Sequence, residues 1–109
     1  MVKEVRQYEV YWISLDPTQG SEIAKTRPCV VVSPDELNQF LRTVIVIPVT
    51  STIKNYPWRV HCVVAGRDGS IAVDQIEVID RIRIGSKIAV LSKREIIQLK
   101  EVMKKMLID

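Results

Sequence analysis

The chain has 109 residues, 47% of them apolar and 27% charged, and a net charge of +3 at pH 7. This length suits a single domain, residues 1–109, because so small a chain has apolar surface for one core only. No stretch approaches the roughly 18 apolar residues of a membrane span, and the opening segment MVKEVRQYEV lacks the apolar region of a secretory signal. Membrane and secreted proteins are therefore disfavoured, and we expect a soluble cytoplasmic protein.

Composition also bears on partners. The mean hydropathy of +0.08 leaves apolar surface that so small a monomer does not cover, so we expect a homo-oligomer. The pI near 9.0 permits a nucleic-acid or acidic-protein partner without requiring one. The clearest clusters of cations are Lys25 with Arg27, Lys54 with Arg59, and Arg81 with Arg83. This clustering indicates local binding sites.

Short strands separated by turn signals follow one another along the chain. Runs rich in β-branched residues predict strands at 8–15, 28–33, 43–50, 58–65, 71–80 and 87–91. The run 44–49 is apolar at every position, so we expect cover on both faces, with something packed on its outer face. Because Pro48 cannot donate to a central ladder, the strand should end or bulge near it and present Thr50 and Ser51 outward.

Two capping boxes of the form Ser-x-x-Glu predict helix starts. SPDE at 33–36, with Pro34 at the first helical position, predicts a short helix through about Phe40. SKRE at 92–95 predicts a terminal helix. Its apolar residues recur at spacings of three and four and form a stripe for the barrel or a partner: Ile96, Leu99, Met103 and Met106. Short strands closed by a C-terminal helix predict a mainly β fold, a small SH3-like barrel.

The cysteines and the histidine have structural interpretations. Cys29 and Cys62 stand singly within apolar runs, without the paired spacing of a metal site. We therefore expect buried thiols, no disulfide and no metal. The single histidine, His61, lies in the middle of a predicted strand, so we expect a structural role for it. Trp12, on the first strand, is expected in the core.

Two irregular segments are candidates for function. Residues 16–26 (DPTQGSEIAKT) are long for a hairpin connection, and form either a surface loop without a role or a flap over the entrance to Arg27. Residues 48–59 (PVTSTIKNYPWR) place hydroxyls directly after Pro48. These hydroxyls either serve an ordinary turn or face outward as donors.

Three ordered motifs carry a resemblance to a known family: GSEIAKTRPCVVVSP (20–34), PVTSTIKNYPW (48–58) and VDQIEVID (73–80). With these motifs the chain resembles the MazF/PemK (Kid) toxins of type II toxin–antitoxin systems along nearly all its length. The resemblance implies a CcdB/MazF-type SH3-like barrel, a homodimer and a cognate antitoxin protein. It further implies an endoribonuclease, or mRNA interferase, that cuts single-stranded RNA without a metal or other cofactor. The RNA 2′-hydroxyl would attack, leaving a 2′,3′-cyclic phosphate and a 5′-hydroxyl.

The resemblance also assigns site residues by their places in the motifs. Arg27 and Thr50 match the catalytic pair, with Ser51 as a neighbouring site residue, and Glu22 is the acid of the flap motif. Asp74 and Gln75 match the DQ at which some members place an RNA-contacting or catalytic acid. The chain departs from those relatives that carry an arginine at the position of Ala72, or a histidine at the position of Thr26.

The chemistry explains these residue types. Attack by the 2′-oxygen builds negative charge on the phosphate, so catalysis needs fixed donors aimed at that charge. The guanidinium of Arg27 binds two phosphate oxygens at once and stays charged, so we assign it to electrostatic stabilisation and not to proton transfer. Thr50 is expected to donate to the same phosphate. Proton transfer stays open between Glu22 and Asp74.

RNA binding requires cations for the backbone and flat partners for the bases. Lys25 and Lys54 are the expected phosphate contacts, and Gln75 is an expected RNA contact by its motif. Trp58, at a strand start, belongs either to the core or to the RNA interface.

Two alternatives of other classes stay open. CcdB-type toxins share the fold and poison gyrase through a terminal helix with a tryptophan near its end, but the segment EVMKKMLID has none. A barrel that binds RNA or protein without cutting is the other alternative. It requires that Arg27 and Thr50 do not converge.

Overall fold

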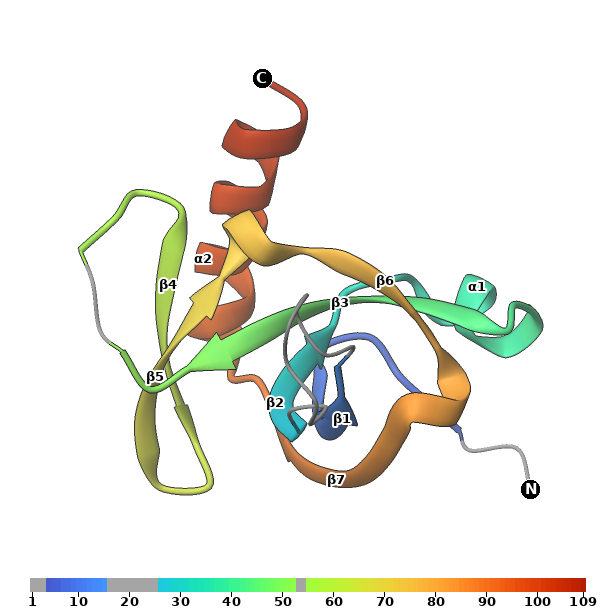
Figure 1. Ribbon diagram of the computed structural model, residues 1–109. Helices are drawn as coiled ribbons and strands as arrows, with labels where there is room; N and C mark the ends of the chain where they lie inside the picture. Colours follow the sequence, from blue (N-terminus) through green and yellow to red (C-terminus); the bar gives the residue numbers. More distant parts are fainter. Residues whose placement is uncertain (1–3, 16–25, 53–54) are drawn as a thin grey trace, which may run out of the picture.

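The computed structural model describes residues 4–15, 26–52 and 55–109 (Figure 1). The strands are β1 (Glu9–Ser14), β2 (Thr26–Val31), β3 (Thr43–Thr50), β4 (Arg59–Val64), β5 (Arg67–Ala72), β6 (Glu77–Asp80) and β7 (Ile84–Val90). The helices are α1 (Asp35–Phe40) and α2 (Lys93–Leu107), with short 3-10 turns η1 (Val73–Gln75) and η2 (Arg81–Arg83).

The strands form one antiparallel sheet in the order β4-β5-β3-β2-β1-β7, and β6 pairs with β3 beside this path. The sheet curls into a half-barrel, and α2 stands at its β4 side (Figure 1). The mainly β fold with a C-terminal helix is therefore confirmed. The strand expected at 71–80 is broken, because η1 separates the end of β5 from β6.

Strand β3 is covered on both faces by the chain's own residues. Ile47 and Val49 pack in the cluster that includes α2, whereas Val44 and Val46 pack in the cluster on the other face. Alternate side chains of a strand point to opposite faces, and each face here meets a core. The expected cover of both faces is confirmed, but no second copy is needed for 44–49, so that argument for a dimer was wrong.

The strand passes through Pro48 and ends near it, as expected. β3 pairs with β6 at residues 43–46 and with β5 at Val49 and Thr50, so Pro48 lies where one neighbour replaces the other. On its other side Pro48 pairs with Cys29 of β2. A residue without an N–H is tolerated at this gap between two ladders. The strand then ends at Thr50, and Ser51 is exposed.

The first capping box is absent and the second is present. The Ser33 hydroxyl lies 2.5 Å from Asn38 Oδ1 and accepts from Ile45 N at 3.1 Å. The helix α1 therefore begins at Asp35 without a side-chain cap, and Pro34 is its N-cap and not its first helical residue. At α2, the Ser92 hydroxyl accepts from Glu95 N at 3.1 Å, and the Glu95 carboxylate accepts from Ser92 N at 2.8 Å. These paired bonds satisfy two of the free N–H groups at the helix start.

The expected apolar stripe of α2 holds for its first three members. Leu99 is buried, and Ile96 and Met103 pack against the same core. Met106 is instead 42% exposed, and Val102 packs against the core one turn earlier. Cys29 and Cys62 are buried free thiols, as expected. Burial raises the pKa of each thiol to about 12, which keeps both unreactive at neutral pH.

Candidate active site

A hollow of about 720 Å³ opens where the ends of several strands meet. Its wall is drawn from β1, β2, β3, the β4–β5 hairpin and β7. The lining residues include Trp12, Arg27, Pro28, Val49, Thr50, Ser51, Thr52, Ala65, Arg67, Asp68 and Gly69. A hollow of this size accommodates a small ligand or part of a polymer.

Arg27 stands at the rim because of the register of β2. It pairs with Ile13 of β1, and Cys29, two residues on, is already fully buried. The guanidinium therefore lies where the core ends and the hollow begins. Within the part of the chain that the structure describes, Arg27 makes no ion pair. Its charge is thus available to an anion.

Thr50 reaches the same hollow from the last position of β3, where it pairs with Ser70 of β5. The Thr50 hydroxyl oxygen accepts a hydrogen bond from Thr52 N at 3.0 Å. A hydroxyl that accepts in this way still has its own proton to donate. This bond also fixes the position of the oxygen, so Thr50 presents an oriented donor beside Arg27.

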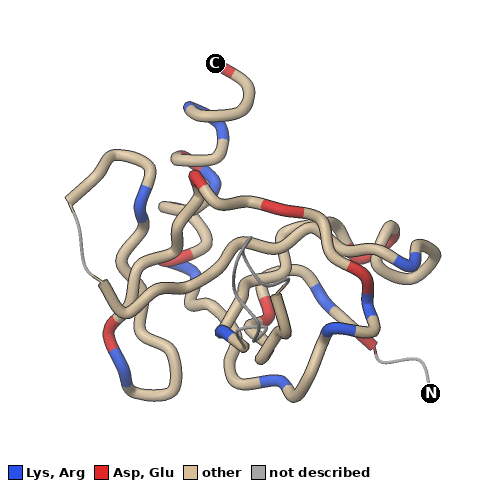
Figure 2. The backbone as a smooth tube through the Cα atoms, in the orientation of Figure 1, with Lys and Arg blue, Asp and Glu red and all other residues tan. Residues whose placement is uncertain are grey.

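The hollow carries more positive than negative charge. Arg27 and Arg67 face it with a single carboxylate residue, Asp68. Figure 2 shows basic positions on β2 and on the β4–β5 hairpin. By the sequence, acidic residues lie within η1 (Asp74) and β6 (Glu77 and Asp80). An anionic ligand is therefore favoured in the hollow.

The structure brings part of the expected site together. Arg27, Thr50 and Ser51 share the hollow. Asp74, Gln75 and Trp58 are not among the residues that line it. Glu22, Lys25 and Lys54, and the expected flap over 16–26 apart from Thr26, lie outside the described residues.

Asp74 is paired elsewhere. Its carboxylate accepts from Arg59 Nε at 2.9 Å and from an Arg59 terminal nitrogen at 3.3 Å. Beside this pair, the rings of Tyr56 and Trp58 stack with centroids 4.9 Å apart. The expected RNA-contacting residues of 56–75 thus form a separate group from the hollow.

The expectation that Trp12 lies in the core was wrong, whereas a structural role for His61 stays a prediction. Trp12 is 43% exposed and lines the hollow, so it is not a core residue. His61 lies on the exposed face of β4, with Nε2 3.0 Å from Asp68 Oδ1. It packs in neither core cluster, because alternate residues of β4 face away from the core.

Arg67 and Gly69 were missed by sequence reasoning. Both line the hollow from β5, directly after a hairpin turn in which Ala65 and Gly66 have φ values of 52° and 78°. Positive φ at both central residues is the type I′ turn, whose twist suits a two-residue hairpin. The signal available was the dipeptide Ala65-Gly66 between two β-type runs, which would have placed Arg67 at the start of a strand.

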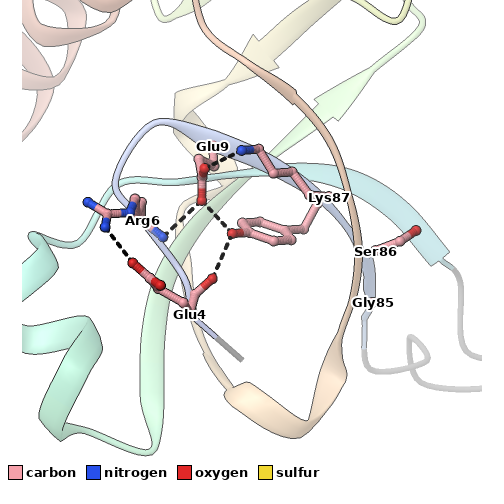
Figure 3. Close-up of a pocket in the computed structure, with 7 residues that line it drawn as sticks. Glu4, Arg6, Glu9, Gly85, Ser86 and Lys87 are labelled. Carbon is pink, nitrogen blue, oxygen red and sulfur yellow. Dashed lines mark hydrogen bonds and ion pairs between the residues drawn. The ribbon is translucent and has the colours of Figure 1, made fainter. Parts of the chain in front are cut away.

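A second hollow, of about 450 Å³, lies between the N-terminal segment and β7 (Figure 3). Glu9 is at its centre: it accepts from the Tyr11 hydroxyl at 2.5 Å and from Arg6 N at 3.1 Å, and pairs with Lys87 Nζ at 2.6 Å. Glu4 pairs with Arg6 beside it. The charges of these two ion pairs neutralise one another. The pair of Glu9 with Lys87 fastens β1 to β7 across the hollow.

Metal-binding clusters and membrane-spanning helices are the other features that bear on function. Among the described residues, no group of three or more His, Cys, Asp or Glu is placed to hold a metal ion. No helix within residues 4–15, 26–52 and 55–109 is long and apolar enough to cross a membrane.

The curled sheet, the terminal helix and a hollow lined by an arginine that pairs with no described carboxylate and by an oriented hydroxyl define a class of small half-barrel proteins with an anion site at the rim. The family model described as "PemK-like, MazF-like toxin of type II toxin-antitoxin system" matches residues 6–107. The chain belongs to this family, which confirms the resemblance of the three motifs.

Individual relatives agree with this assignment. The endoribonuclease toxin MazF of Escherichia coli K12 is 38% identical over 71 residues, a match of 65% of this chain and 64% of the relative. The match thus spans slightly less than two thirds of that relative. The crystal structure of MazF from Deinococcus radiodurans has a TM-score of 0.82 at 24% identity, covering 96% of this chain and 97% of that one. A MazE-MazF structure from the same organism gives 0.77 at 27% identity, covering 95% and 93%.

Proposed function

We propose that the protein is a sequence-specific endoribonuclease toxin that cleaves single-stranded RNA, chiefly mRNA, in the hollow of Arg27 and Thr50. The observation that carries the proposal is the convergence of these two side chains from β2 and β3 on one hollow. Family membership and the endoribonuclease names of the Escherichia coli relatives MazF and PemK support the same activity. A barrel that binds without cutting is disfavoured, because it required that the two side chains stay apart.

The proposed reaction needs no metal. The RNA 2′-oxygen attacks the adjacent phosphorus and loses its proton, the bond from phosphorus to the 5′-oxygen breaks, and that oxygen leaves with a proton. The products are a 2′,3′-cyclic phosphate and a 5′-hydroxyl. Arg27 holds two phosphate oxygens and Thr50 donates to the same group, so both stabilise the charge that develops in the transition state. Glu22 stays a candidate for proton transfer.

The partners follow from the family. We propose a cognate antitoxin protein, since a chain that cuts cellular RNA needs an inhibitor, and the MazE-MazF structures show such a pairing for relatives. An acidic segment of the antitoxin would place carboxylates on Arg27 in the way that RNA places phosphates. A symmetric homodimer and a cytoplasmic location complete the proposal.

Incubation with a long unstructured RNA in the presence of a chelator tests the activity. We expect discrete fragments with 2′,3′-cyclic phosphate and 5′-hydroxyl ends. A matched RNA with a single 2′-deoxy nucleotide before one cut site should stay intact at that site only, because the attacking hydroxyl is missing there.

The controls separate the alternatives. Cleavage that requires an added divalent metal, or that proceeds at the 2′-deoxy position, would refute the mechanism. If RNA is bound and never cut, the protein is an RNA-binding protein and not an enzyme.

A further inference from the structure

Outside the hollow, the most distinctive exposed feature is a pair of stacked aromatic rings. Tyr56 and Trp58 lie with centroids 4.9 Å apart and an interplanar angle of 21°. Their exposed fractions are 40% and 37%, so neither ring is buried in the core. A stacked pair held at the surface offers a flat apolar face to a ligand.

An ion pair fixes these rings in place. The Arg59 guanidinium lies 5.7 Å from the centre of the Tyr56 ring and makes two hydrogen bonds to the Asp74 carboxylate. The Arg59 side chain is only 12% exposed, so this pair is sheltered from solvent more than an ordinary surface pair. Arg59 thereby links the aromatic pair to η1.

The backbone reinforces the link. Arg59 N donates to the Tyr56 carbonyl at 3.1 Å, and Val73 N donates to the Trp58 carbonyl at 3.2 Å. The Trp58 carbonyl is thus tied to η1 through Val73 N, and Arg59 is tied to it through the Asp74 carboxylate. A ligand that stacks here meets a surface that is already ordered, which lowers the entropy cost of binding.

The same connection joins the rings to the hollow. It begins with Ser51 and Thr52, which line the hollow, and ends with Tyr56 and Trp58. An extended polymer that occupies the hollow and continues along this connection would reach the rings. Single-stranded RNA suits this arrangement, because its phosphates find Arg27 and its unpaired bases have flat faces for an aromatic ring.

We propose that Trp58, backed by Tyr56, is a stacking platform for an unpaired base of the RNA, and that Arg59 and Asp74 are positioning residues that hold the platform. The proposal rests on the proposed function for the identity of the ligand. It also assigns Asp74 a role other than proton transfer: both carboxylate oxygens are bonded to Arg59, and Asp74 is not among the residues that line the hollow.

Fluorescence of Trp58 gives a direct test. The chain has two tryptophans, so Trp12→Phe leaves Trp58 as the only reporter. The ligand is a single-stranded oligonucleotide with 2′-deoxy sugars throughout, which cannot be cut by the proposed mechanism, and its binding is measured independently by anisotropy. We expect Trp58 emission to be quenched as the oligonucleotide binds. An oligonucleotide with abasic sites outside the cleaved step should bind more weakly and quench less.

Substitution of the ring measures its contribution. In the same Trp12→Phe background, Trp58→Ala should weaken binding about 5- to 150-fold, the range for loss of one base–aromatic stack, and Trp58→Phe should restore most of it. If oligonucleotide binds and Trp58→Ala binds equally well, the platform is refuted while the proposed function stands. If no form of the chain, wild type included, binds the oligonucleotide or cleaves RNA, both proposals are refuted. A change of oligomeric state in Trp58→Ala would also overturn the platform, by assigning the rings to an interface between copies.

The role of Asp74 is tested with Arg59→Gln and Asp74→Asn, singly and together, and Arg94→Gln on α2 is the matched arginine control. If the two residues act as one holder of the platform, both single variants weaken binding by the same factor and the double variant by no more. Their cleavage rate at saturating RNA should match the parent, as should both properties of Arg94→Gln. A saturated rate that falls in Asp74→Asn but not in Arg59→Gln would return Asp74 to proton transfer and refute the positioning role.

Discussion

At the scale of single residues, Gly69 places the end of β3 because it has no side chain. A Cβ at this position would lie 2.9 Å from Val49 Cγ1 and 3.2 Å from the Thr50 carbonyl oxygen. The first distance is closer than carbon atoms tolerate, and a β-branched valine has few other rotamers to adopt. The close approach of β5 to β3 therefore depends on glycine, and so does the position of Thr50.

Gly69→Ala should consequently lose about 1–3 kcal/mol of unfolding free energy through overpacking, and also lose cleavage at saturating RNA because Thr50 moves. Denaturant unfolding and single-turnover rates measure the two effects. Gly66→Ala is the control: its φ of 78° makes alanine strained, but a Cβ there meets nothing within 4 Å. It should lose stability and keep the rate. Normal stability and rate in Gly69→Ala would show that β3 is not held in this way.

The motifs that resemble the family indicated Arg27 and Thr50 as a pair, and the structure places both at one hollow. Arg67 could not be found in the same way, because its place depends on a hairpin that brings β5 beside β3. The pairing of Asp74 with Arg59 joins residues 15 positions apart. A motif that identifies Asp74 as an acid carries no information about which basic residue pairs with its carboxylate.

At the scale of elements, the Glu9 network fastens β1 to β7. Burial by itself would raise the pKa of Glu9, but the hydrogen bonds from Lys87, Tyr11 and Arg6 N outweigh it and hold the pKa below its ordinary value of 4.5. A carboxylate with a lowered pKa stabilises the fold above its unfolded pKa, and this stabilisation is lost as the pH falls through the folded value.

Glu9→Gln should therefore cost about 1–3 kcal/mol at pH 7, the usual range for a buried charge-assisted hydrogen-bond network. The difference between wild type and variant should shrink as the pH falls below 4.5, because wild-type Glu9 takes up a proton as the pH passes through its lowered folded pKa. Urea unfolding at each pH measures it. A difference that stays constant over this range would show that the Glu9 charge does not contribute.

The elements themselves were largely predictable where the signal is local. The capping box at Ser92 and Glu95 is confirmed, because its partners are three residues apart and nothing competes for them. The similar box at Ser33 was wrong, since Asn38 and the distant Ile45 take the hydroxyl. Pro48 correctly indicated a strand end nearby, but which strands flank β3 at that point is decided by the sheet order and not by the local sequence.

At the scale of the whole molecule, the half-barrel separates two functions. Two core clusters lie on opposite faces of β3, one of them against α2, while the open strand ends form the hollow that Arg27 lines. The apolar surface that remains is elsewhere than 44–49: Phe40 and Ile82 are 83% and 87% exposed. A dimer therefore stays a prediction, and residues other than those of β3 would have to form it.

The central claim is that RNA is cleaved in the hollow where Arg27 and Thr50 meet. The most direct measurement compares the single-turnover cleavage rates of wild type, Arg27→Ala and Arg94→Ala on the same RNA in chelator, with folding checked by denaturant unfolding. We predict that Arg27→Ala is slowed at least about 100-fold, as for loss of one transition-state donor, with its fold intact, and that Arg94→Ala on α2 matches wild type. A folded Arg27→Ala that cleaves at the wild-type rate would contradict the account and place the reaction elsewhere.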